Sequence, residues 1–291
     1  MKETLGIMTD DDAYARHTPV TSPGPHAALL RALPDDPHDL VPLLQNVLVH
    51  HSRVDGFAAG TGRPDDGTEV RPVRALLDRI DALDDRPWDA PRPDGHRLVV
   101  DCRSIAVVMC AVLREHGVPA RVRFGFAGYL APTHWQSHVI CEHADAIRGT
   151  ADGGWTRTDP DLGRHRVGVA EFVDAGQAWA AAPADVDLPR YGYGPALRGR
   201  WAVRWELTRD LAALTGFEPL TSDVWGLVAT LPEDDPAAAD DAFARVAGAR
   251  SRSERLALAA DPAFAVPPVI TAAPYLTGAV HKVDLAAEGS L

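Results

Sequence analysis

Residues 98–122 decide the fold, and they read LVVDCRSIAVVMCAVLREHGVPARV. The stretch opens on an apolar triplet typical of a short strand, and Asp101 then stands where a helix N-cap is expected. The apolar spacing that follows predicts a helix from Cys102 to about His116. Pro119 prevents that helix from continuing. We therefore expect a strand, a helix that begins at Cys102, and a turn into a second strand.

Cys102 falls in the first turn of this predicted helix. The free backbone N–H groups and the positive end of the helix dipole favour a thiolate at such a position. On this reasoning the pKa of Cys102 is expected to be depressed, which suits a nucleophile. The structural alternative is a small buried residue at a helix start, because most free cysteines are buried hydrophobes.

Two candidate partners lie on predicted strands further along the chain. His138 belongs to a strand over about 137–142, and Asp159 ends a strand over about 155–158. An imidazole can take the proton of a thiol, and a carboxylate can bind the other ring nitrogen and fix its tautomer. Each residue alone is commonly structural, as a core or surface histidine or a turn aspartate. Together they predict a Cys-His-Asp catalytic triad.

Three motifs in the same order resemble transglutaminase-like domains. The stretch from Cys102 to Val122 is similar to the nucleophile helix of that superfamily, with its Leu-Arg-x-x-Gly-Ile-Pro-Ala-Arg type exit into a strand. The segment HVICE from His138 resembles the family's His-x-x-x-Glu strand. The segment WTRTDP, which contains Asp159, matches its Trp-x-x-x-Asp-Pro. The resemblance covers about residues 70–162.

The register of the histidine strand has one competitor. The family often has Trp or Tyr two residues after its histidine, whereas Ile140 stands here, and His134-Trp135 lies just upstream. His134 shares the parity of His138 on an extended strand and could point into the same cleft. His138 is preferred because Glu142 then follows four residues later, as in the family.

The resemblance implies an α+β fold with a papain-like, transglutaminase-like core, in which the nucleophile helix packs on an antiparallel sheet. It also implies an acyl-thioester on Cys102, which an amine resolves in amide formation or transamidation, or which water resolves in an amidase or peptidase. The backbone N–H of Cys102 is expected in the oxyanion hole. A second donor is expected from residues 88–98, with Trp88 and His96 as weak candidates.

Two alternatives remain open at this point. One is a non-catalytic binding module that keeps the transglutaminase fold. The other is a metal site built from Cys102, His138 and Asp159. No cofactor is expected for the acyl-transfer chemistry.

The remaining chain is expected to add mainly helical regions to the core. Residues 1–24 predict a loose leader, 25–165 the catalytic core with N-terminal helices, and 166–291 a mainly helical region that covers the core. Within that last region, 171–182 predicts a helix, Trp201–Leu214 a helix buried on most sides, and the Pro-rich tail from Ala265 irregular structure.

Composition limits the partners and the compartment. The net charge of −12 argues against nucleic acid as a partner. The apolar runs are shorter than the roughly 20 residues needed to cross a membrane, so no membrane partner is expected. Three cysteines are too few for a disulfide framework, and the first residues lack a signal-peptide pattern. We expect a cytoplasmic protein that acts on a small-molecule, peptide or carrier-bound acyl substrate.

Overall fold

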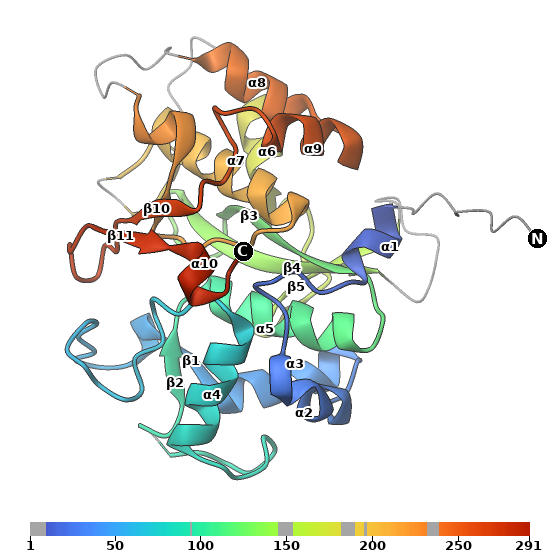
Figure 1. The fold of residues 1–291 in the computed structure, drawn as a ribbon, viewed down its shortest axis with the longest axis vertical. Coiled ribbons are helices and arrows are strands. Elements are labelled where there is room, and N and C mark those ends of the chain that lie inside the picture. Colours follow the sequence, from blue (N-terminus) through green and yellow to red (C-terminus); the bar gives the residue numbers. More distant parts are fainter. Residues whose placement is uncertain (1–9, 94, 145–153, 182–189, 195–196, 232–238) are drawn as a thin grey trace, which may run out of the picture.

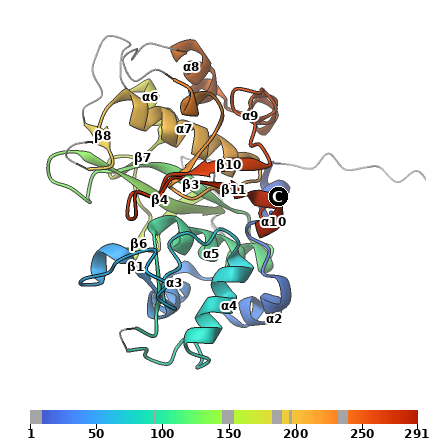
Figure 2. The ribbon, with the colours of Figure 1, turned by 60° about the vertical axis from the view of Figure 1, so that its left-hand side comes forward.

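A central antiparallel sheet lies between two layers of helices in the computed structural model (Figure 1). The structure describes residues 10–93, 95–144, 154–181, 190–194, 197–231 and 239–291. Helices α2 to α5 lie on one side of the sheet and α6 to α9 on the other, an arrangement that a second view shows again (Figure 2). The expected α+β fold is confirmed.

The helices are α1 (Asp10–Tyr14), α2 (Ala27–Ala32), α3 (Pro37–Val47), α4 (Val73–Leu83), α5 (Cys102–Glu115), α6 (Ala175–Ala180), α7 (Arg200–Thr215), α8 (Asp240–Gly248), α9 (Arg252–Ala259) and α10 (Leu285–Glu288), with short 3-10 turns η1 (Gly24–His26), η2 (His51–Arg53) and η3 (Gly226–Ala229). The strands are β1 (Leu48–His50), β2 (Leu98–Val100), β3 (Ala120–Ala127), β4 (Trp135–Ala144), β5 (Trp155–Asp159), β6 (Arg164–His165), β7 (Phe172–Asp174), β8 (Tyr191–Gly192), β9 (Asp223–Val224), β10 (Val269–Ala272) and β11 (His281–Asp284).

Helix α5 begins and ends where the sequence predicts. The Asp101 side chain caps it by accepting a hydrogen bond from the backbone N–H of Ser104, at 2.9 Å. After its last turn the chain adopts a positive φ of 74° at Gly117, a conformation that favours glycine. Every residue from 102 to 114 is buried, so α5 lies inside the molecule and positions Cys102 rigidly.

The strands that carry the two partner residues form the middle of the main sheet. Its order is β6-β5-β4-β3-β7, and β8 adds to β4. Strand β4 pairs antiparallel with β3 and with β5, which places Gly125 opposite His138 and Thr158 opposite Cys141. The predicted strands are confirmed, although β3 and β4 are longer than the alternating patterns indicated.

A second, parallel pair of strands prepares the start of α5. Strand β1 pairs with β2 so that His50 lies opposite Val100. The two strands are about fifty residues apart in the sequence, so no local pattern indicates that they pair. The pairing brings the turn η2 to the same end of this small sheet as Asp101 and Cys102.

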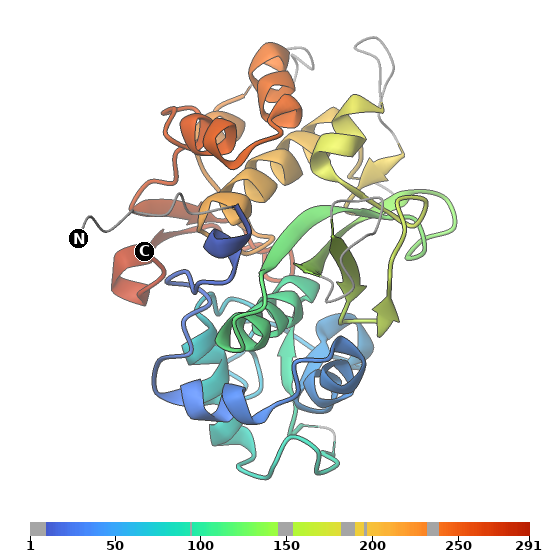
Figure 3. The ribbon, with the colours of Figure 1, turned by 90° about the vertical axis from the view of Figure 1, so that its right-hand side faces the viewer.

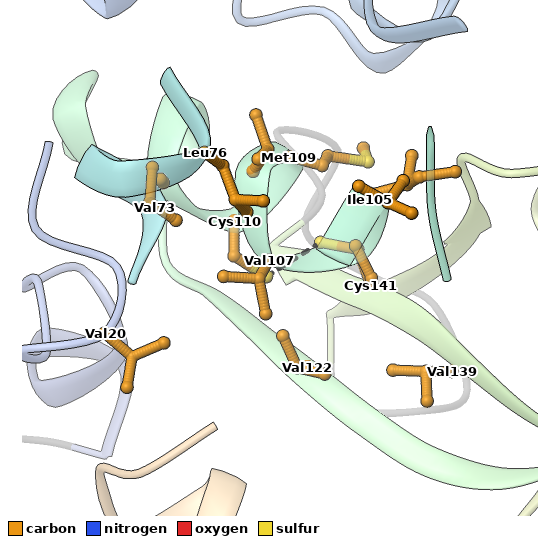
Figure 4. Close-up of a cluster of buried hydrophobic side chains, with 14 of the residues drawn as sticks. Val20, Val73, Leu76, Ile105, Val107, Met109, Cys110, Val122, Val139 and Cys141 are labelled. Carbon is orange, nitrogen blue, oxygen red and sulfur yellow. Dashed lines mark hydrogen bonds between the residues drawn. The ribbon is translucent and has the colours of Figure 1, made fainter. Parts of the chain in front are cut away.

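The core is divided by the main sheet. One hydrophobic cluster joins α3, α4 and α5 to the sheet. Figure 4 shows part of it, with Ile105 and Cys110 of α5 near Val122, Val139 and Cys141 of β3 and β4. A second cluster joins the sheet to α6, α7 and α8, in the upper layer of Figure 3.

The C-terminal region differs from its expectation in two places. The helix predicted over 171–182 begins as strand β7, which pairs with β3 as the edge of the main sheet, and only then continues as α6. The tail beyond Ala265 forms β10, β11 and α10. Both segments form strands because they pair with strands distant in the sequence or beyond a turn, and local apolar spacing does not indicate such pairing. The helix α7 is confirmed as buried on most of its sides.

The first described residues are packed and not loose. Tyr14 is 4% exposed and Val20 is fully buried, and the Tyr14 hydroxyl donates to the carbonyl of Leu214 at 3.1 Å. Residues 1–9 lie outside the described part of the chain. Across the described residues, no helix combines the length and the apolar character that a membrane span requires.

Candidate active site

The three predicted residues lie together at the N-terminal end of α5. His138 Nε2 is 2.9 Å from Asp159 Oδ2. His138 also acts on the Cys102 thiol, by charge and by hydrogen bonding that lower the pKa of the thiol. Since Asp159 takes Nε2, Nδ1 is the ring nitrogen available to the thiol. All three residues are buried, with exposed fractions of 7%, 3% and 0% for Cys102, His138 and Asp159.

Asp159 is held by four donors from three directions. The Tyr129 hydroxyl donates to Oδ2 at 2.8 Å, the same oxygen that His138 contacts. The backbone N–H groups of Asp161 and Leu162 donate to Oδ1 at 3.0 and 3.2 Å. Burial raises the pKa of Asp159, but His138, Tyr129 and the backbone donors outweigh it, so the pKa of Asp159 is lowered. The carboxylate is therefore ionised and fixed in orientation.

Tyr129 is a site residue that the sequence analysis missed. It follows β3 in the connection to β4, and its ring meets the His138 ring edge to face, with centroids 6.2 Å apart. Burial and the neighbouring charge of Asp159 raise the pKa of Tyr129 well above its ordinary value. The phenol is therefore a stable hydrogen-bond donor. Its only sequence signal is an aromatic hydroxyl in a turn next to the strand pair.

The pKa of Cys102 departs from the value expected at a helix start. Burial raises the pKa of the Cys102 thiol, and His138 only partly offsets this effect. Burial also acts on His138, but Asp159 and Cys102 outweigh it and hold the pKa of His138 well above its ordinary value. Asp159 and Cys102 therefore favour the charged form of the imidazole, which is the form that His138 takes once it accepts the proton of the thiol.

The competing histidine is engaged elsewhere. His134 Nε2 bonds the side-chain oxygen of Gln136 at 2.8 Å, on the same segment of chain. Asp159, by contrast, contacts the ring of His138. The geometry accordingly favours the register that the motif comparison with Glu142 predicted.

Two charged residues in the motifs, Glu142 and Arg103, bind groups that belong to the framework of the fold. Glu142 is buried and pairs with Arg121, Arg123 and Arg157, each at 2.8 Å. Arg103 is fully buried, and its guanidinium donates to backbone carbonyls of residues 71, 218 and 219. Both residues fix the elements that carry the site.

The other two cysteines form a buried pair behind the site. Cys110 Sγ of α5 lies 3.2 Å from Cys141 Sγ of β4, and the dashed line in Figure 4 marks this hydrogen bond. Neither cysteine forms a disulfide. Burial raises the pKa of Cys141 well above that of an ordinary thiol. These thiols are core residues, as expected for Cys110.

A small pocket adjoins the start of α5. Its lining includes Asp101, His51, Thr221 and Tyr275. Thr221 donates to Asp101 Oδ2 at 3.0 Å, and the Tyr275 hydroxyl contacts His51 Nε2. Among the described residues, no group of three or more His, Cys, Asp or Glu side chains has the geometry to hold a metal ion.

Comparison with known proteins agrees with the motifs. Residues 94–160 match the model of the transglutaminase-like superfamily. A solved structure from Cytophaga hutchinsonii, described as a candidate cysteine protease, is 15% identical, with a TM-score of 0.36. That match covers 68% of this chain and 65% of the other, so this chain spans slightly less than two thirds of its length. No curated protein matches the chain. The matched residues 94–160 are thus similar to a transglutaminase-like core, and they include Cys102, His138 and Asp159 on α5, β4 and β5.

Proposed function

We propose that the chain is a cysteine-dependent acyl-transfer enzyme that forms an acyl-thioester on Cys102. The observation that carries this proposal is the hydrogen-bonded chain from the Cys102 thiol through His138 to the buried carboxylate of Asp159. A cysteine that is only part of the core does not need a histidine and a carboxylate aligned behind its thiol. A catalytic nucleophile does, because the histidine acts as its base and the carboxylate orients that base.

The reaction follows from the geometry. Neutral His138 takes the proton of the thiol through Nδ1, while Asp159 holds Nε2 and stabilises the imidazolium. The thiolate attacks the carbonyl carbon, and the oxygen becomes an oxyanion near the backbone N–H of Cys102 at the start of α5. The intermediate collapses, the carbon–nitrogen bond breaks, and His138 protonates the leaving amine. The acyl group remains on the sulfur as a thioester.

The second half of the reaction returns the enzyme. His138 removes a proton from the incoming nucleophile, which attacks the thioester carbonyl, and the sulfur leaves as a thiolate that regains its proton. An amine as nucleophile gives amide formation or transamidation, and water gives amide or peptide hydrolysis. The substrate class stays as expected from the resemblance, a small-molecule, peptide or carrier-bound acyl group, and the proposed compartment is the cytoplasm.

Intact mass spectrometry with an activated ester tests the proposal. We expect p-nitrophenyl acetate to leave one acetyl group on the wild-type chain and none on Cys102→Ala. Adding glycine methyl ester then distinguishes the two outcomes, because N-acetylglycine methyl ester indicates acyl transfer and acetate alone indicates hydrolysis. If Cys102 is alkylated by iodoacetamide but never acetylated, the chain is a binding module with this fold and the proposal is wrong.

A further inference from the structure

The oxyanion expected in this reaction needs a second hydrogen-bond donor, and the two side chains named for it from the sequence are not placed to supply it. Trp88 is packed in the hydrophobic core at 4% exposure. His96 Nδ1 contacts Asp84 at 3.2 Å, and the extended strand β2 separates it from Cys102 by about 10 Å or more. The two candidates named from the sequence are therefore badly placed.

Strand β1 ends beside the residues that lead into α5. Because β1 and β2 are parallel, with His50 opposite Val100, the residues that follow both strands emerge at the same edge. Neighbouring strands lie about 4.8 Å apart. The charges of Asp101 and Asp161 act on the ring of His50, and the same two carboxylates act on the Cys102 thiol. His50 and Cys102 thus share their surroundings.

The hydrogen bonds of His50 define which ring nitrogen carries the proton. The backbone N–H of Ser52 donates to Nδ1 at 3.2 Å, so Nδ1 is an acceptor. The Ser52 hydroxyl also contacts Nδ1, at 2.8 Å. Burial is the largest of the effects that lower the pKa of His50 to about 4. The ring is therefore neutral at neutral pH, and its proton resides on Nε2.

This N–H group is available to a ligand. Within the described part of the chain, His50 Nε2 has no hydrogen-bond partner, and the side chain is only half-buried. The neighbouring His51 differs in this respect, because its Nε2 already contacts the Tyr275 hydroxyl. The two rings lie against each other, with centroids 4.3 Å apart.

We propose that His50 is a further catalytic residue, which donates its Nε2–H to the carbonyl oxygen of the acyl group on Cys102 and completes the oxyanion hole with the backbone N–H of Cys102. This inference rests on the proposed acyl transfer. A neutral imidazole suits the role, since it donates without adding a proton that the intermediate could take. The role is distinct from that of His138, which moves protons.

Two probes of Cys102 separate this role from a structural one. Acetylation by p-nitrophenyl acetate passes through an oxyanion, whereas alkylation by iodoacetamide does not. We expect His50→Ala to slow acetylation about 10²- to 10³-fold, as loss of one oxyanion donor does, and to leave alkylation within a factor of about two. His50→Gln keeps a donor and should recover part of the rate, and His51→Ala is the matched control with both rates near wild type.

Each other result overturns the assignment in a recognisable way. Equal acetylation of wild type and His50→Ala shows that His50 is not the donor, although the acyl-transfer function stands. A parallel loss of acetylation and alkylation shows that His50 only maintains the structure. A selective loss in His51→Ala moves the donor to His51. If the wild-type chain is alkylated but not acetylated, the proposed function itself fails, and this inference fails with it.

Discussion

At the scale of single residues, one oxygen of Asp159 receives two donors. Oδ2 accepts from Tyr129 at 2.8 Å and lies 2.9 Å from His138 Nε2. The phenol thus holds the carboxylate in the plane that the imidazole requires. Its role is positioning, because it contacts neither the thiol nor the expected place of the substrate.

Removing that hydroxyl tests the role of Tyr129. We expect Tyr129→Phe to slow acetylation of Cys102 by about tenfold, since a hydrogen bond to a charged group contributes about 1.5–3 kcal/mol. Tyr129 helps to lower the pKa of Asp159, so the pKa of Asp159 should be higher in the variant. As the pH is lowered, acetylation by the variant should therefore decline at a higher pH than acetylation by the wild type. Tyr14→Phe is the control, as its hydroxyl meets a backbone carbonyl away from the site. An unchanged rate and pH profile would leave Tyr129 without this role.

The choice between the two histidines is a second test at this scale. His138→Ala removes the group that lowers the pKa of the Cys102 thiol, so burial then acts unopposed. We expect alkylation and acetylation to fall by at least about 10²-fold, a typical contribution of a general base. The ring of His134 contacts Gln136 and Thr133, neither of which is a site residue, so His134→Ala should change both rates by a few-fold at most. The reverse ranking would shift the base to His134.

The ionisation of Cys102 shows what a local pattern cannot contain. The first turn of α5 could be identified from Asp101 and the apolar spacing, and a helix N-terminus alone would depress the pKa of a thiol. The same residue is 7% exposed because α5 is covered by segments from distant parts of the chain. Burial therefore raises the pKa of Cys102 instead of lowering it. This effect depends on the folded chain and cannot be predicted from the helix start alone.

A pH titration of alkylation measures that reversal. With the pKa of Cys102 raised, the thiolate fraction should increase only above the roughly 8.5 of a free thiol. Cys102 should still react before Cys110 and Cys141, which are completely buried. An iodoacetamide rate whose midpoint lies below that of a model thiol would show that the helix and His138 prevail over burial in the ligand-free protein.

At the scale of elements, Glu142 connects the three central strands. Its carboxylate on β4 pairs with Arg121 and Arg123 of β3 and with Arg157 of β5. Burial raises the pKa of Glu142, but the three guanidinium groups outweigh it and lower that pKa strongly. The sequence motif could predict the position of this residue, whereas the residues that pair with it depend on the register of two hairpins.

Neutralising Glu142 should destabilise the sheet. We expect Glu142→Gln to lower the free energy of unfolding by about 3–5 kcal/mol, because it removes the charge of a buried carboxylate that three arginines share. The wild-type advantage is present above the unfolded pKa of a glutamate and is lost as pH falls through the lowered folded value. Urea unfolding at pH 7 and at lower pH measures both. Glu171→Gln is the control, since its pair with Arg164 is exposed and should contribute at most about 1 kcal/mol.

Elements differ in how far their own sequence determines them. Helix α5 and the strands β3 to β5 have caps, turns and apolar spacing within a few residues, so they could be predicted closely. The pair β1–β2 joins segments about fifty residues apart, and the edge strand β7 depends on β3. Because these pairs are non-local, the position of His50 and the C-terminal strands could not be predicted from local sequence patterns.

At the scale of the whole molecule, the segment after residue 165 supplies partners to the core. Asp210 of α7 binds the guanidinium of Arg123 and the backbone N–H of Phe124. Glu218 forms a buried pair with Arg114 at the end of α5, at 2.9 Å. Arg71 forms another with Asp223, at 2.6 Å. The family motifs end at Asp159 and Pro160, but the interior that they need extends through the C-terminal region.

Truncation after residue 170 tests whether the core is independent. The shortened chain would keep Arg71 and Arg114 at buried positions and lose the carboxylates of Asp223 and Glu218 that neutralise them. Breaking one buried pair in this way costs about 3–5 kcal/mol, and a typical domain has only about 5–15 kcal/mol of stability. The chain would also lose the hydrophobic cluster on the α7 side of the sheet, which exposes Phe126.

We therefore expect the fragment 1–170 to lack a cooperative urea transition and to bind the dye ANS, while Cys102, Cys110 and Cys141 become alkylated at similar rates. The full-length chain, treated identically, should unfold cooperatively and show selective labelling of Cys102. The labelling pattern is the decisive measurement, because selectivity requires the buried core and the His138 contact together. A fragment that unfolds cooperatively and keeps selective labelling would show that residues 171–291 are an appendage, and that the buried ion pairs across residue 165 contribute little to the fold.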